Sequence, residues 1–318
     1  MRHLFRTLSC TVVILAGPTI SAQSADTCKT RNVVVNVRDK SGKLIVGLPP
    51  TSFRITLQGQ PAKVVSSKVE IALPRVVLVL DASGSMTFLK GKWQDARLAT
   101  EDIIKCPVPM RLALVVFAEG VFEVMDFGHT SGQILARIEQ LSDSEKVTPK
   151  GKGRTSLRDA ILRATDLLGT PLPGDTIYAV TDGGDNASRA STKDLKRTLI
   201  ARGTRFFAFI FENTPHESED ETLGAIETGE IARDTGGSDV SFSIGLYNKA
   251  SAPLPSALPQ LYDQIAYFYQ LEVALPFTTG KGLRWNIDVL DDHGQRRKDV
   301  TVYYPRDAAP CSEAIAQH

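Results

Sequence analysis

The middle of the chain alternates short, wholly apolar runs with longer stretches in which apolar residues recur at helical spacing. A run made only of Val and Leu, as at 76–80, is typical of a parallel strand buried on both faces. The predicted strands are 76–80, 111–117, 121–127, 176–181, 205–211 and 239–243. The predicted helices are 92–105, 131–141, 156–168, 192–201 and 221–234. This alternation predicts an α/β fold with a doubly wound, mostly parallel sheet. The short link between Phe117 and Val121 predicts a hairpin, and therefore one antiparallel edge strand.

The two flanks of this region follow a different pattern, because polar and apolar residues alternate there as in half-buried strands. Such runs occur at 33–38 and 53–57, and again near 271–275, 283–290 and 299–304, after a helix over about 258–268. Each flank alone has too few strands to be stable. We therefore predict a central domain at 74–250 and one small β module, in which an N-terminal segment (26–73) packs with a C-terminal segment (251–318).

The first residues have the features of an export signal. Arg2 and Arg6 precede an apolar stretch at 8–16, which is followed by Gly17-Pro18 and then by small residues. This order predicts a signal peptide over residues 1–25. The apolar stretch is short for a membrane anchor, which needs about 20 residues. We therefore expect a secreted, periplasmic or envelope protein with no membrane span after cleavage, and an uncleaved anchor is the alternative.

Export also bears on the cysteines. Removal of the signal takes Cys10 with it and leaves Cys28, Cys106 and Cys311, an odd number in a compartment that permits disulfides. A bridge between Cys28 and Cys311, near the two ends of the mature chain, is a hypothesis. We expect Cys106 to be free and buried.

The composition excludes few classes of protein, but the net charge disfavours nucleic acid as a partner. Of 318 residues, 42% are hydrophobic and 23% are charged, and the formal net charge is +1. These values are ordinary for a globular protein. A net charge near zero argues against a surface for nucleic acid.

A candidate cation site lies where the first central strand ends. Asp81 closes the strand, and Ser83 and Ser85 follow at alternate positions around Gly84. A tight loop can turn these three oxygens inward, at the strand end where open α/β sheets place their ligands. Donors that are all oxygen suit Mg²⁺, Mn²⁺ or Ca²⁺ rather than Zn²⁺. The alternative is a polar turn in which Ser85 caps the next helix.

Two further segments support the prediction of a cation site. Thr155 lies in a glycine loop before a helix, and Asp182 ends another apolar strand ahead of Gly183. Asp-x-Ser-x-Ser, then a loop Thr, then Asp-Gly at a strand end resembles the von Willebrand factor type A (VWA) domain, whose fold is Rossmann-like. Taken alone, Thr155 is open to interpretation as part of a helix cap with Ser156 and Asp159, and Asp182 as part of a plain turn.

The resemblance implies a metal-ion-dependent adhesion site (MIDAS) formed by Asp81, Ser83, Ser85, Thr155 and Asp182. In that site Ser83, Ser85 and Thr155 would bind Mg²⁺ directly, whereas Asp81 and Asp182 would hold it largely through water. The flanks, at 35–48 and at Tyr303-Tyr304-Pro305, also resemble those of bacterial exported VWA-related proteins.

The resemblance implies a non-enzymatic module for adhesion or scaffolding. Hydroxyl ligands leave the ion electrophilic, so that an acidic side chain of a protein partner can complete its shell. Met86, Thr87 and Phe88 are expected to border that contact. One alternative is a hydrolase that uses the same ion to activate water. The sequence shows no evident general base beside the motif, which disfavours this alternative. Another is an envelope scaffold whose ligand site is inactive.

Overall fold

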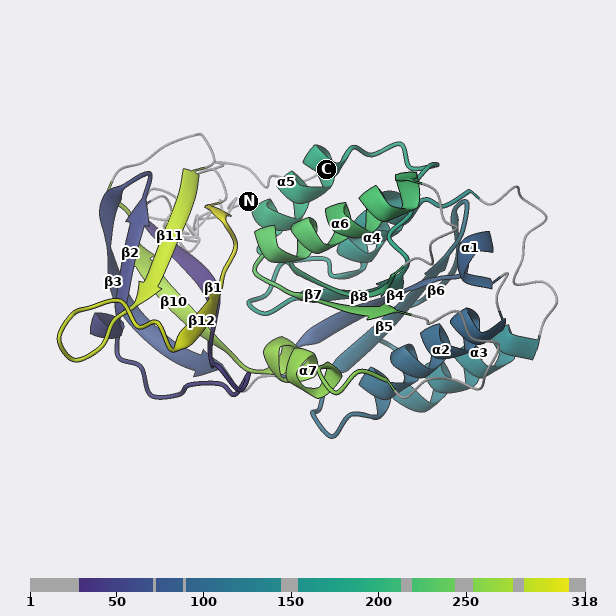
Figure 1. Cartoon of the computed structure of the whole chain (residues 1–318), viewed down its shortest axis with the longest axis horizontal. Coiled ribbons are helices and arrows are strands. Elements are labelled where there is room, and N and C mark those ends of the chain that lie inside the picture. Colours follow the sequence, from purple (N-terminus) through teal and green to yellow (C-terminus); the bar gives the residue numbers. More distant parts are fainter. Residues whose placement is uncertain are drawn as a thin grey trace, which may run out of the picture.

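The computed structural model describes residues 29–70, 73–87, 90–143, 154–212, 219–243, 254–276 and 283–308, which form two units, each built on one β-sheet (Figure 1). The predicted signal peptide lies outside the described residues, as do Cys28 and Cys311. Cys106 is a free thiol, as expected, but it is half-buried rather than buried. Within the described ranges, no helix combines the length and apolar character needed to cross a bilayer.

The larger unit contains a six-stranded sheet in the order β6-β5-β4-β7-β8-β9. Its strands are β4 (Arg75–Asp81), β5 (Arg111–Phe117), β6 (Val121–Met125), β7 (Thr176–Thr181), β8 (Arg205–Glu212) and β9 (Asp239–Ser243). All neighbours pair in parallel except β6, which pairs antiparallel with β5 at one edge. The predicted mostly parallel sheet with one antiparallel edge strand is therefore confirmed.

Helices lie on both faces of this sheet (Figure 1). One face carries α2 (Lys90–Lys105), α3 (Ser131–Asp143) and α7 (Leu258–Ala266), and the other carries α4 (Leu157–Leu167), α5 (Thr192–Arg202) and α6 (Glu219–Asp234). A single turn, α1 (Gly84–Thr87), follows β4.

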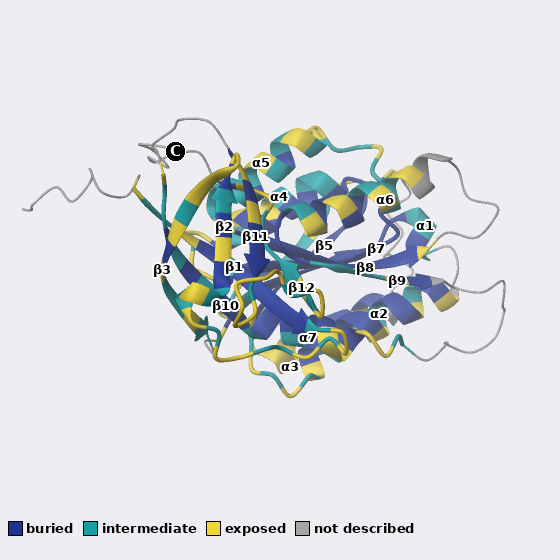
Figure 2. Cartoon of the chain, turned by 60° about the vertical axis from the view of Figure 1, so that its left-hand side comes forward, coloured by how far each residue is buried: buried dark blue, intermediate teal, exposed yellow. Residues whose placement is uncertain are grey.

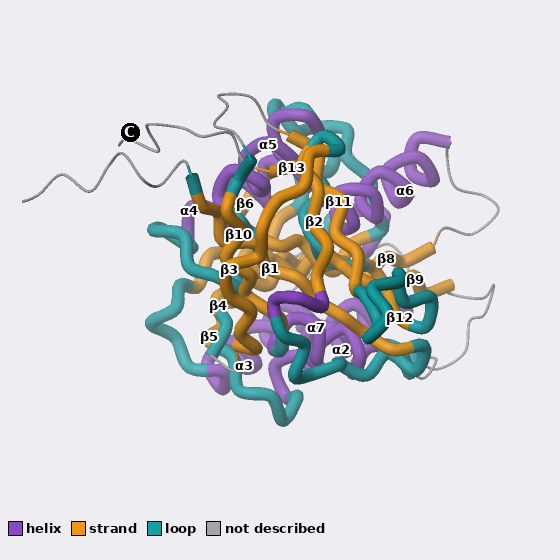
Figure 3. Tube along the Cα trace, turned by 90° about the vertical axis from the view of Figure 1, so that its left-hand side faces the viewer, coloured by secondary structure: helices purple, strands orange, loops and turns teal. Residues whose placement is uncertain are grey.

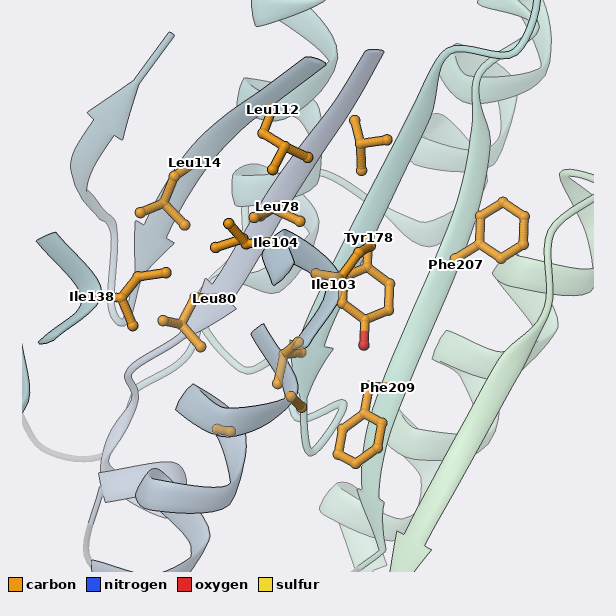
Figure 4. Packing of buried hydrophobic residues seen from close by; sticks show 14 of the residues in the cluster. Leu78, Leu80, Ile103, Ile104, Leu112, Leu114, Ile138, Tyr178, Phe207 and Phe209 are labelled. Carbon is orange, nitrogen blue, oxygen red and sulfur yellow. The ribbon is translucent and has the colours of Figure 1, made fainter. Parts of the chain in front are cut away.

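The apolar run of β4 fills both layers of core. Leu78 and Leu80 pack with Ile103 of α2 and Ile138 of α3 (Figure 4). Val77 and Val79 point to the opposite face and pack in the cluster that contains Ile161 of α4. Because successive side chains of a strand point to opposite faces, an unbroken apolar run is the pattern that a strand covered on both sides requires.

The smaller unit is a seven-stranded antiparallel sheet in the order β12-β1-β10-β3-β2-β11-β13. Its elements are β1 (Thr30–Asp39), η1 (Pro50–Ser52), β2 (Phe53–Leu57), β3 (Gln60–Glu70), β10 (Phe268–Ala274), β11 (Leu283–Val289), β12 (Val300–Tyr303) and β13 (Asp307–Ala308). The sheet contains strands from before and from after the central unit, and β10 lies between β1 and β3 (Figure 3). The inner strands β4 and β7 of the central sheet are almost wholly buried, whereas much of β3 is exposed (Figure 2).

Helix α7 joins the two units. Its apolar residues, including Leu261 and Ile265, lie in the central core. Its last carbonyls accept hydrogen bonds from the smaller sheet, since Asn36 Nδ2 lies 3.0 Å from the Gln264 oxygen and Arg38 Nη2 lies 2.8 Å from the Asp263 oxygen. The prediction of a helix to residue 268 is wrong by two residues, because Phe268 already pairs with Glu70 in the smaller sheet.

Candidate metal centre

Three of the predicted ligands lie together where β4 ends. The Asp81 carboxylate accepts the backbone N–H of Ser83 at 2.8 Å through Oδ1 and the hydroxyl of Thr181 at 2.6 Å through Oδ2. The hydroxyl oxygens of Ser83 and Ser85 are 3.2 Å apart. Asp81 and Ser83 are buried, and Ser85 is half-buried at the surface of the loop. The loop after β4 therefore gathers one carboxylate and two hydroxyls, as the spacing predicts.

Asp182 comes to the same edge of the sheet from β7, the neighbour of β4. Its Oδ2 accepts a hydrogen bond from Lys92 Nζ at 2.8 Å, and its Oδ1 accepts the N–H of Gly184 at 3.3 Å. Gly183 donates to Thr181, the residue that also bonds Asp81. Thr181 and Lys92 were not foreseen, because one is an ordinary strand residue and the other an ordinary helix lysine in the sequence.

Thr155 is attached to this edge by the loop that follows Asp182. Its N–H donates to Asn186 Oδ1 at 2.8 Å, and its carbonyl accepts the N–H groups of Asn186 and Ala187 at 3.0 and 2.9 Å. In the described residues no hydrogen bond joins the Thr155 hydroxyl to the other four predicted ligands. The structure thus brings the Thr155 and Asp182 loops together through the backbone of Thr155, which bonds both the backbone and the side chain of Asn186.

The predicted alternative for Thr155, a helix cap formed with Ser156 and Asp159, is wrong. The Ser156 hydroxyl donates to the Ala118 carbonyl at 3.2 Å and does not cap α4. The Asp159 carboxylate instead accepts the N–H groups of Arg189 and Ala190, both at 3.0 Å. These bonds tie the start of α4 to the loop after β7.

A close backbone contact holds the Asp182 loop against α6. Gly183 has a φ of +84°, and a Cβ there would lie 2.6 Å from the Cα of Ala225. A Cβ on Gly224 would in turn meet the Gly183 carbonyl oxygen at 2.3 Å. Only glycine fits both positions, so the loop has little freedom to move away from the candidate site.

The electrostatics of the site favour an added positive charge. Burial, and then the neighbouring charge of Asp182, raise the pKa of Asp81 to about 7, although hydrogen bonds from Thr181 and Ser83 act in the opposite direction. Asp81 and Asp182 are both 0% exposed, and Lys92 is 2% exposed. Among the described residues the Lys92 ammonium pairs with Asp182 and no ion pair is formed by Asp81, so ionisation of Asp81 adds a negative charge to be balanced.

The donor set fits a hard divalent cation. It consists of carboxylate and hydroxyl oxygens, and among the described residues no group of three or more His, Cys, Asp or Glu side chains forms an alternative site. The site is not formed by oxygen atoms alone, because the Lys92 ammonium lies beside Asp182 and already compensates its charge.

Of the three residues expected to border a contact, the structure describes Met86 and Thr87. Met86 is 0% exposed and belongs to the central core, so the prediction for it is wrong. Thr87 is half-buried, and its hydroxyl donates to the Ser83 carbonyl at 2.9 Å. Phe88 lies outside the described residues. A short helix of one turn places Met86 inward, which alternation along the sequence could not reveal.

The comparisons with known proteins agree with the domain type. Residues 76–184 match the family described as von Willebrand factor type A domain. No curated protein matches the chain.

Several solved structures align with the chain at low identity. Proximal thread matrix protein 1 from the mussel byssus, whose MIDAS motif is occupied by zinc, is 17% identical over 65% of this chain, with a TM-score of 0.46. This chain covers 50% of that protein. BatB from Bacteroides thetaiotaomicron is 20% identical over 60% of this chain and 97% of its own, with a TM-score of 0.43. The manganese-loaded TRAP protein of Plasmodium vivax is 15% identical over 75% of this chain and 95% of its own, with a TM-score of 0.41.

Proposed function

Starting from a von Willebrand factor type A domain at residues 76–184, we propose that this protein binds a protein partner through a divalent cation at the carboxyl edge of its central sheet. Asp81, Ser83, Ser85, Thr155 and Asp182 would hold the ion, with Mg²⁺ as the first candidate and Mn²⁺ or Ca²⁺ as the others. When bound, the ion supplies an electrophilic position that an acidic side chain of the partner completes.

One observation carries the proposal. The buried carboxylate of Asp81 lies beside Asp182, and Lys92 compensates only one of these two charges. A divalent ion would offset the remaining negative charge in a place where solvent cannot. The Ser83 and Ser85 hydroxyls, 3.2 Å apart, would face that ion without adding charge to it.

We propose binding rather than catalysis, because the two carboxylates are already engaged inside the protein. Asp81 accepts from Ser83 and Thr181, and Asp182 accepts from Lys92. Groups held in this way suit orientation of a cation better than removal of a proton from water. The N-terminal pattern supports export, so we place the partner in the cell envelope or outside the cell.

The test combines calorimetry with capture of the partner. Mg²⁺ titrated into the mature protein should bind at one site, and Thr155→Ala should weaken that binding. Thr130→Ala, at an exposed threonine, is the matched control. A partner captured from envelope extract should be released by EDTA and recovered with Mg²⁺. A partner that is indifferent both to EDTA and to Thr155→Ala would show that the metal does not mediate the contact.

A further inference from the structure

A cavity of about 400 Å³ lies where the two units meet, and none of the residues that line it belongs to the candidate metal centre. It is lined by the start of β1, the loop at 171–173, the end of α5 with the residues leading into β8, and the paired strands β11 and β13. Cavities between units, with volumes of about 300 to 1,000 Å³, are a common setting for small ligands. Arg205 is the first residue of β8, whereas the metal centre lies where β4 and β7 end. The cavity is therefore at the amino ends of the parallel strands, and the metal centre is at their carboxyl ends.

The wall of this cavity carries an excess of positive charge. It includes Arg31, Arg202 and Arg205, against a single carboxylate, that of Asp307. In the described part of the chain Arg202 and Arg205 form no ion pair. Arg202 bonds the Gly169 carbonyl, and Arg205 bonds carbonyls and the Thr176 hydroxyl. Burial lowers the pKa of Arg205 to about 9 and lowers that of Arg31 from its ordinary value. An anion beside these groups would stabilise their charged forms.

Two further donors in the wall are buried without a hydrogen-bond partner. They are the Thr204 hydroxyl and the Trp285 indole N–H, and their residues are 2% and 4% exposed. Buried donors are nearly always paired in native structures, and an indole N–H can only donate. Their position in a cavity wall points to an acceptor that enters from the cavity.

The rest of the wall is apolar. Val33, Leu199 and Ala308 are buried there, and Leu172 is 50% exposed among the lining residues. A ligand that satisfied only the arginines would leave this surface in contact with water. The wall therefore suits a molecule with one charged end and one apolar end.

We propose that this cavity binds a small organic anion, with a carboxylate or phosphate head directed at the arginines and an apolar body against Val33, Leu199 and Leu172. This site is separate from the metal centre, and it does not depend on the proposed function. Ligand binding there would bridge the smaller sheet and the central unit.

The test uses octanoate as the probe, with octanol and inorganic phosphate as partial mimics that carry only the apolar body or only the charge. Octanoate should bind the mature protein at one site in calorimetry and change the fluorescence of Trp285, while each partial mimic binds at least about tenfold more weakly. Arg202→Gln should weaken octanoate binding about tenfold through the loss of a charged donor. Arg197→Gln changes another arginine of α5, 69% exposed and paired with Asp194, and should leave the affinity unchanged.

Circular dichroism tests whether each variant is folded. Arg31→Gln serves as a second variant if Arg202→Gln does not fold. Equal affinity of wild type, Arg202→Gln and Arg31→Gln for octanoate would overturn the proposal, as would the absence of saturable binding of both octanoate and octyl phosphate. Binding only after removal of residues 309–318 would also overturn it, because the natural occupant would then be the chain's own end. Preference for octyl phosphate over octanoate would support the site and identify its head group.

Discussion

Both ends of the central sheet bury charged side chains, but they balance the charge differently. At the amino ends, Arg75 and Asp175 form a two-point ion pair at 2.7 and 2.9 Å, and Arg205 bonds three backbone carbonyls. At the carboxyl ends, Asp81 lies beside Asp182, and among the described residues the one ion pair there is that of Lys92 with Asp182.

This difference separates a cluster that holds the two units together from one whose charge is incompletely balanced. The Arg205 guanidinium also lies 4.5 Å from the ring centre of Phe268, which belongs to the smaller sheet. Its contacts therefore join the two units, and removing it should affect folding. The carboxyl-end cluster contacts loops, and its charge is incompletely balanced, so removing it should affect ligand binding.

The largest effect is expected for Arg205→Met. The change removes the guanidinium that donates to the carbonyls of Gln264, Ile265 and Gly174, and leaves the Ile265 carbonyl without that donor. It should lower the free energy of unfolding by about 3 kcal/mol or more. Urea unfolding measures it. The exposed control Arg197→Met should stay within about 0.5 kcal/mol of wild type. Metal affinity should not change, and a loss of metal binding in a folded Arg205→Met protein would break the proposed separation of the two ends.

The next largest effect is expected for Asp81→Asn. The substitution keeps the shape of the side chain and removes a buried charge, so metal affinity should fall about 100-fold, while the metal-free protein stays folded. Calorimetry with Mg²⁺ measures the affinity. Asp126→Asn, at a carboxylate that is 68% exposed, is the control. Unchanged affinity in Asp81→Asn would remove this residue from the site.

A pH dependence sharpens the comparison further. The raised pKa of Asp81, about 7 against an ordinary value of 3.8, means that protons compete with the metal. Metal affinity should fall by up to about tenfold per pH unit below pH 7. In EDTA, where no metal is bound, the quantity that depends on pH is the free energy of unfolding, and it changes in the opposite direction to the metal affinity. Between about pH 4 and 7 the folded state holds a proton that the unfolded state has lost, so this carboxyl lowers stability as the pH rises. Denaturant unfolding of wild type and Asp81→Asn across that range isolates the contribution, and parallel curves would contradict it.

The smallest effect is expected for Lys92→Met. Loss of the ammonium removes repulsion toward a bound cation and should raise Mg²⁺ affinity about threefold to tenfold. It also leaves Asp182 buried and unpaired, so the metal-free protein should lose stability that Mg²⁺ restores. Lys105→Met, at a lysine that is 56% exposed, is the control. A fall in Mg²⁺ affinity would mean that Lys92 mainly positions Asp182.

The central strands and part of the candidate site could be predicted from the sequence, because local patterns of residues indicate them. Unbroken Val/Leu runs marked strands covered on both sides, and the short link after Phe117 marked the antiparallel edge strand. Strand β3 was not resolved as an element, because Gln58 and Gly59 form a two-residue turn with positive φ at both positions, and one Gln in such a turn is a weak signal. The ends of α7 and β10 were shifted because pairing with β1 and β3 overrides the local helical pattern.

The sequence by itself determined the alternation of strands and helices in the central unit, and it placed Asp81 and Asp182 at strand ends with Ser83 and Ser85 in the loop that follows Asp81, because periodicity and spacing are local properties. Only the tertiary structure decided that Lys92 balances Asp182, that Thr181 holds Asp81, and that three arginines line one cavity between the units. These pairings join residues that are far apart in the chain. Burial determines which of them matter, since an ammonium or a guanidinium has a large effect on its neighbours only where water is excluded.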